Sequence, residues 1–197
     1  MNDATHRLRS AARRLAGIAR RSAGSPAESA LVVLVPEAES TVRDLRAELD
    51  PGHAMPAHIT VLYPFAPVGV LDSAVSSALS TIFASVDAFD FELAEMKWFG
   101  DRVAYVAPRP DSSFREMTTG VVKRFPQYPP YGGAFAEIVP HLCVAEDAPI
   151  DRMRSAAESV AADLPIPARA AHVHLMGYRA ARGTWQVLEK FALRSTS

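Results

Sequence analysis

The chain has 197 residues, of which 49 % are hydrophobic and 22 % charged, a composition typical of a folded globular protein. The formal net charge of −1 combines a basic first 28 residues with an acidic body, and the acidic body argues against a general nucleic-acid coat. No apolar run is long enough to cross a membrane. A single cysteine, Cys143, excludes an internal disulfide and a thiolate-rich zinc site, and it is typical of a reducing cytoplasm.

The first 28 residues form a basic arm. They carry six arginines against Asp3 and Glu28, and they lack the apolar core of a secretory signal. Apolar residues recur in the arm at helical spacing, which is typical of an amphipathic helix that binds phosphate backbones or anionic lipid. The alternative, which we prefer because composition alone supports nothing sharper, is a frayed tail or an over-extended start. We expect residues 1–28 to be this arm and residues 29–197 to form one domain.

The elements of the first half have clear signals. A continuous apolar and β-branched run at residues 31–35 predicts a buried strand that ends at Pro36. The elements predicted after it are a helix over 37–49, a strand over 58–63, a helix over 72–83 capped by Asp72, and a hairpin of 89–99 and 102–107. The first half therefore places a strand that carries His58 between two helices.

The same order of elements repeats in the second half. The predicted elements are a helix over 113–125, a loop over 128–133, a strand over 138–144, a helix over 151–163 capped by Asp151, and a hairpin of 170–179 and 185–193. Each half consists of a helix, a histidine-bearing strand, a helix and a hairpin. We expect two α+β lobes, from residues of about 30–110 and 111–195, that face each other across a central cleft.

Each central strand carries the same short motif. The two stretches are Pro-Ala-His-Ile-Thr-Val at 56–61 and Val-Pro-His-Leu-Cys-Val at 139–144. Because residues i and i+2 of a strand point to the same face, His58 shares a face with Thr60, and His141 shares one with Cys143. Two such strands on opposite walls of a cleft would bring two imidazoles and two small polar groups around one point.

This pair of imidazoles suits phosphoryl transfer without a metal or another cofactor. A neutral imidazole takes a proton from the nucleophile and a protonated one gives a proton to the departing oxygen, and a histidine pKa of about 6.5 keeps both forms populated. Short polar side chains beside them would contact the non-bridging oxygens. We assign His58 and His141 as base and acid in either order, and Thr60 and Cys143 as phosphate contacts.

These motifs resemble the signature of the two-histidine phosphoesterase superfamily, H-x-[Thr/Ser]-apolar. Residues 58–61 match it, and residues 141–144 match it except for the cysteine. The stretches 56–65 and 130–135, and a closing strand with Trp185 and Phe191, strengthen the resemblance, which covers about residues 30–195. The bacterial 2'-5' RNA ligase and cyclic phosphodiesterase branch is the most similar.

The resemblance implies a bilobed α+β fold with two pseudo-symmetric antiparallel sheets, helices on the outside and no metal. It also implies activity on 2',3'-cyclic or 2'-5' phosphodiesters of RNA ends or small nucleotides, with 2'-5' ligation in vitro as the reverse reaction. We expect a cytoplasmic monomer that acts in RNA processing and has no membrane partner.

Cys143 is where the chain departs from the family's pattern. We expect the thiol to be neutral. A thiol is a weaker hydrogen-bond donor than a hydroxyl, so we also expect the second half-site, the part of the site formed by His141 and Cys143, to bind phosphate more weakly. A cysteine nucleophile would leave one histidine and Thr60 without a role. The departure keeps a second function open, that of a catalytically weak module that binds nucleotides or RNA ends.

Other side chains allow two interpretations each. Four aromatic residues flank the motif strands and either stack a nucleobase or fill the core, namely Tyr63, Phe65, Tyr131 and Phe135. His172 and His174 would share one strand face, as in some metal sites, but no carboxylate or cysteine cluster accompanies them. We therefore interpret the second pair as part of a partly exposed hairpin face.

Overall fold

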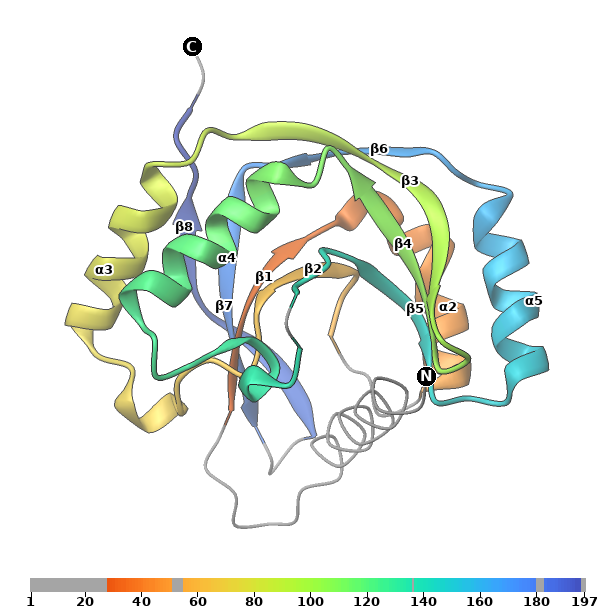
Figure 1. Cartoon of the computed structure of the whole chain (residues 1–197), viewed down its shortest axis with the longest axis horizontal. Helices are drawn as coiled ribbons and strands as arrows, with labels where there is room; N and C mark the ends of the chain where they lie inside the picture. Colours follow the sequence, from red (N-terminus) through yellow and green to blue (C-terminus); the bar gives the residue numbers. More distant parts are fainter. Residues whose placement is uncertain (1–27, 51–54, 136, 180–182, 196–197) are drawn as a thin grey trace.

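The computed structural model describes residues 28–50, 55–135, 137–179 and 183–195, which form two four-stranded antiparallel sheets (Figure 1). The strand order of the first sheet is β2 (His58–Leu62), β1 (Ser29–Leu34), β7 (His172–Arg179) and β8 (Thr184–Ala192). The order of the second is β5 (Leu142–Glu146), β4 (Val103–Arg109), β3 (Phe89–Phe99) and β6 (Ile166–Ala170). The basic arm expected over residues 1–28 lies outside the described residues except for Glu28.

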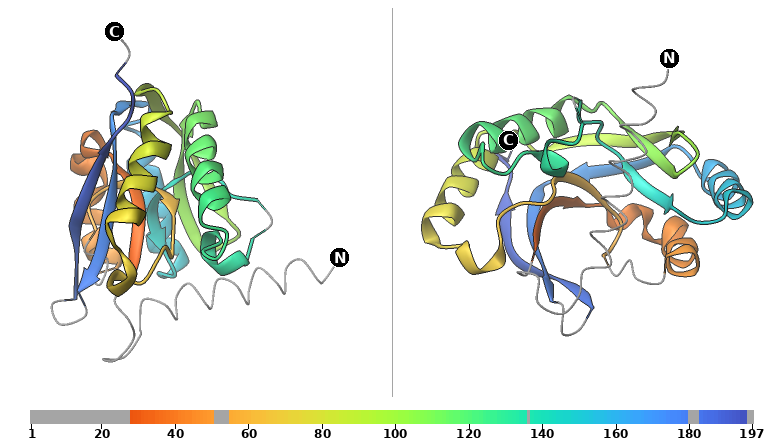
Figure 2. Two further views of the ribbon diagram at one scale, coloured as in Figure 1. Left: turned by 90° about the vertical axis from the view of Figure 1, so that its left-hand side faces the viewer. Right: turned by 60° about the horizontal axis from the view of Figure 1, so that its bottom comes forward.

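Helices lie at opposite sides of the two sheets (Figure 2). The α-helices are α2 (Glu39–Leu49), α3 (Ser73–Ala84), α4 (Ser112–Arg124) and α5 (Ile150–Ala161), and the short 3-10 turns are η1 (Pro36–Ala38), η2 (Val68–Val70) and η3 (Pro130–Gly133). Helices α3 and α4 pack together and contact the first sheet, whereas α2 and α5 pack together and contact the second. The expected α+β class, with two antiparallel sheets and helices around them, is confirmed.

The two sheets are not the two halves of the sequence. The hairpin of β3 and β4, from the first half, pairs with β5 and β6 of the second half. The hairpin of β7 and β8 returns to pair with β1. The two halves of the chain thus exchange hairpins between the sheets. The sequence of a hairpin determines its internal pairing but not the neighbouring strand with which it pairs, so the repeat did not reveal this exchange. Each sheet consequently has a motif strand at its edge, and these edge strands, β2 and β5, contact each other.

Strand β6 was not predicted from the sequence. Its residues include Pro167 and the small side chains of Ala168 and Ala170, which have low strand propensity. The strand forms at the edge of the second sheet by pairing with β3, where Pro167 lies opposite Glu92. Proline is tolerated at an edge because no further strand needs its missing N–H. The pairing with β3 therefore determines that these residues form a strand, and their local sequence pattern does not.

Two element boundaries also differ from the prediction. The strand expected over 138–144 begins only at Leu142, so that His141 immediately precedes β5. Helix α5 begins after Pro149, which places Asp151 inside the first turn and not at the N-cap. The cap predicted for α3 is present, because the Asp72 carboxylate accepts hydrogen bonds from the backbone N–H groups of the first turn.

One apolar core joins both motif strands to the helices. Ile59 and Val61 of β2 and Leu142 and Val144 of β5 belong to it, and each is at most 1 % exposed. Full burial of such a side chain contributes about 1.5–3 kcal/mol. A slip of one residue in either strand would exchange these side chains for polar ones, so the core fixes which face carries the motif residues.

Candidate active site

The two motif histidines occupy equivalent positions at the start of edge strands. His58 is the first residue of β2, and its Nδ1 lies 2.7 Å from the carbonyl oxygen of Pro56. The Nδ1 atom of His141 lies 2.8 Å from the carbonyl oxygen of Val139. A carbonyl only accepts, so each Nδ1 carries the proton and donates it, which leaves Nε2 as the nitrogen for proton exchange. Both imidazoles are thus held in the same tautomer by the same local contact.

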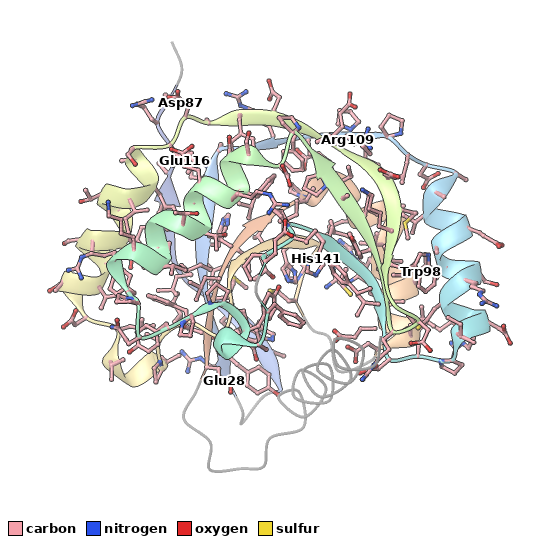
Figure 3. The ribbon with its side chains drawn as sticks, in the orientation of Figure 1. Glu28, Asp87, Trp98, Arg109, Glu116 and His141 are labelled. Carbon is pink, nitrogen blue, oxygen red and sulfur yellow. The ribbon has the colours of Figure 1, made fainter. Side chains whose placement is uncertain are left out.

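His141 lies near the centre of the molecule, where β2 and β5 meet (Figure 3). Its ring packs edge-on against Phe99 at 5.2 Å and Tyr105 at 5.3 Å between ring centroids. Burial lowers the pKa of His141, and the hydrogen bond to Val139 opposes this only in part. The imidazole is therefore neutral at pH 7, which is the form a general base needs.

Thr60 and Cys143 follow their histidines at the i+2 position and are both half-buried. Cys143 lies directly opposite Tyr105 in the pairing of β5 with β4. Burial raises the pKa of the Cys143 thiol to about 12, with a further contribution from the Glu146 carboxylate. The thiol is consequently neutral at pH 7 and acts neither as a thiolate nucleophile nor as an anion that repels phosphate.

The loop that carries Tyr131 is docked against the end of β2. The backbone N–H of Tyr131 donates to the carbonyl oxygen of Tyr63 at 2.6 Å. Burial raises the pKa of the Tyr131 hydroxyl, and the nearby Glu146 and Cys143 groups add to the effect. Tyr131 has a φ of 51°, in the left-handed region that non-glycine residues rarely adopt. The fold thus holds this side chain beside the second half-site at some cost in backbone energy.

The other three aromatic candidates lie in different surroundings. Phe135 packs edge-on against Tyr131 at 5.4 Å, and Tyr63 packs edge-on against Trp185 at 5.9 Å. Phe65 is only 4 % exposed, and its ring packs against the core residues Phe125 and Tyr128. No face of Phe65 is open to a nucleobase, so we correct this assignment to a core role.

Arg46 is a site candidate that the sequence prediction missed. It lies in α2, which packs against β5, and the whole residue is only 7 % exposed. Its place four residues after Val42 and three before Leu49 puts it on the buried face of the helix. This spacing was the available signal, but an arginine in a helix is usually read as a solvated side chain.

His172 and His174 do not form part of a metal cluster. Their rings lie 6.4 Å apart on β7, and Lys190 of β8 is directly opposite His174. Burial lowers the pKa of both, and the Lys190 charge adds to this. In the described part of the chain, no group of three His, Cys, Asp or Glu side chains is placed to hold a metal ion.

A family model described as the 2'-5' RNA ligase superfamily matches residues 25–182. The chain belongs to the 2'-5' RNA ligase superfamily. The structure is similar to that of E. coli LigT in its apo form, with 18 % sequence identity and a TM-score of 0.54. The match covers 87 % of this chain and 99 % of LigT. TT0787 of Thermus thermophilus is 17 % identical, with a TM-score of 0.57 and coverage of 86 % of this chain and 100 % of TT0787.

A structure of E. coli LigT complexed with NADP+ is similar to the same extent, with 20 % identity and a TM-score of 0.54 over 87 % of this chain and 99 % of LigT. At these identities the structures establish a shared fold for this member of the 2'-5' RNA ligase superfamily. A comparison with curated proteins finds no match. None of the described helices is long and apolar enough to cross a bilayer.

Proposed function

We propose that the protein is a metal-independent phosphoesterase that cleaves 2',3'-cyclic or 2'-5' phosphodiesters of RNA ends or small nucleotides. The observation that carries this proposal is the matched pair of histidines. His58 begins β2 and His141 immediately precedes β5, these two edge strands are in contact, and each Nδ1 donates to the carbonyl oxygen two residues before it. This arrangement supports a pair of Nε2 atoms that act as acid and base on one phosphate.

The burial of His141 favours an order for the two roles. In hydrolysis of a 2',3'-cyclic phosphate, the neutral Nε2 of His141 takes a proton from water as the water oxygen bonds to phosphorus. The bond from phosphorus to one ribose oxygen breaks, and protonated His58 gives its Nε2 proton to that oxygen. The product is a phosphate monoester, and solvent then returns both histidines to their starting states. Thr60 donates its hydroxyl hydrogen to a non-bridging oxygen.

Aromatic contacts would hold the base of the substrate. Tyr131 and Phe135 form an edge-on pair in the loop beside Cys143, and Tyr63 lies at the end of β2. Stacking on such rings is worth about 1–3 kcal/mol per base and tolerates any base. This arrangement supports a substrate class defined by its phosphodiester and not by one nucleobase.

Turnover of a 2',3'-cyclic nucleotide in excess chelator tests the proposal. We expect turnover to persist in chelator, and His58→Ala or His141→Ala to lower kcat by roughly 10²–10⁴-fold, the usual effect of one positioned proton-transfer group. His172→Ala serves as the matched control, because it removes a histidine that we assign no role. Full turnover in the double variant, or a requirement for added zinc, would refute the mechanism.

One observation favours a second candidate function. The neutral Cys143 thiol donates poorly to phosphate, which is consistent with a module that binds nucleotides or RNA ends with little turnover. Saturable binding of a cyclic nucleotide without its hydrolysis would select this alternative.

A further inference from the structure

Arg46 has a buried guanidinium that is not paired within the described part of the chain. The residue is 7 % exposed, and its Nη2 atom is fully enclosed with no hydrogen-bond partner there. Among the described residues, no ion pair joins Arg46 to a carboxylate. A buried charge without a partner is costly, so an unpaired buried guanidinium needs an explanation, and a bound anion is one that its charge favours.

Helix α2 ties this guanidinium to both motif strands. Glu39 lies on the same face of α2 as Arg46, and its carboxylate accepts from the backbone N–H of Ala57 at 2.5 Å, one residue before His58. Arg46 lies two turns later on the same helix, and α2 also packs against β5. The Arg46 charge lowers the pKa of the Cys143 thiol, so the two side chains share one neighbourhood.

Two carboxylates lie near Arg46, but neither is joined to it by an ion pair among the described residues. The pKa of Arg46 is lowered by burial, and Cys143, Glu39 and Asp50 oppose that effect. Of these, Cys143 is a neutral thiol, because its pKa is about 12. The Glu39 carboxylate already accepts from Ala57 through one oxygen and from Arg43 through the other, at 3.1 Å. Asp50 lies one helical turn further along α2, at its C-cap.

We propose that Arg46 binds a non-bridging oxygen of the substrate phosphate through Nη2 and supplies the contact that the Cys143 thiol makes poorly. This inference rests on the proposed function, because it assumes that a phosphate occupies the point between the motif strands. A guanidinium suits the role because its fixed N–H groups match phosphate oxygens, and its hydrogen bonds to an anion are charge-assisted. The second half-site would then bind phosphate through a side chain of helix α2 as well as through the side chains at β5.

Inorganic phosphate, measured by the thermal shift of the folded protein, tests the inference without requiring turnover. We expect phosphate to raise the melting temperature of the wild-type protein. Arg46→Met should weaken phosphate affinity by roughly 10- to 100-fold, the loss typical of one hydrogen bond to a charged group. Without phosphate the same variant should melt at an equal or higher temperature, because an apolar side chain of similar length replaces an unpaired buried charge.

Arg43→Met is the matched control, since Arg43 lies on the same helix with its side chain 71 % exposed. It should keep the wild-type phosphate shift. If Arg46→Met keeps wild-type phosphate affinity, or if the wild-type protein shows no phosphate shift, the inference fails. Should Arg46→Met not fold, Arg46→Lys decides: weakened phosphate affinity supports the inference, and unchanged affinity overturns it. Failure of the proposed function has a separate signature, namely phosphate binding through Arg46 without hydrolysis of any cyclic nucleotide.

Discussion

In the proposed mechanism, the proton affinity of His141 limits the reaction in acid. Burial lowers its pKa below the ordinary value of about 6.5, so the base form persists to lower pH than for an exposed histidine. We expect kcat/KM for a cyclic nucleotide to fall on the acid side with an apparent pKa below about 6.5, and to fall again at alkaline pH as the acid deprotonates. An acid limb centred well above 6.5 would contradict His141 as the base.

The same pKa shift has a consequence for folding. The unfolded chain binds a proton at His141 more readily than the folded protein does, so this group stabilises the fold above pH 6.5 relative to lower pH. Its contribution is lost as the pH falls below about 6.5 and is gone below the lowered pKa. The direction of this effect agrees with the acid limb expected for catalysis.

Cys143 is the residue whose replacement should improve the enzyme. A hydroxyl donates a better hydrogen bond to a phosphate oxygen than a thiol does, and threonine suits a strand. We expect Cys143→Thr to raise turnover of a cyclic nucleotide several-fold, the equivalent of about 0.5–1.5 kcal/mol. Cys143→Ala is the control and should stay at or below the wild-type rate. A folded but inactive Cys143→Thr protein would show that the thiol has a chemical role of its own.

At the scale of elements, two aspartates near helix starts should differ in their effect on stability. The Asp72 carboxylate accepts from the backbone N–H groups of Ala74 and Val75 at 3.0 and 2.9 Å, whereas Asp151 makes no capping bond. We expect Asp72→Ala to reduce the free energy of unfolding by about 0.5–2 kcal/mol. Asp151→Ala, a change of the same chemistry at an exposed side chain, should change it by at most about 0.5 kcal/mol. Urea denaturation of both variants measures the difference, and equal losses would contradict the capping assignment.

The elements that sequence predicted well are those with a strong local signal. The buried run at β1, and the alternation of Ile59 and Val61 with the motif residues of β2, made both strands evident and set their faces. By contrast, the sequence of β6 has no such signal, and the strand forms by pairing with β3. The same distinction applies to the proposed site: a repeated local motif predicts the histidines, whereas Arg46 is a candidate only because α2 packs against β5.

At the scale of the whole molecule, the repeat predicted one lobe from each half of the chain, whereas the structure distributes the strands of each half between the two sheets. The exchange of hairpins means that each sheet contains strands from both halves, with one histidine strand at each edge. Hairpin exchange depends on contacts between residues far apart in sequence, and single-sequence periodicity carries no information about these. The pairing of His58 with His141 stays a prediction, and the contact between their two edge strands, β2 and β5, supports it.

The central place of β1 in its sheet has a consequence for how the protein is made. Its two neighbours are β2, which follows it closely, and β7, which extends to Arg179 near the end of the chain. During synthesis β1 therefore emerges long before β7 and keeps one side of its ladder unpaired until β7 has left the ribosome. Long-range pairing of this kind is slow, and an apolar strand with a free edge is prone to aggregate meanwhile. The nascent chain should therefore depend on chaperones in the interval between the emergence of β1 and that of β7.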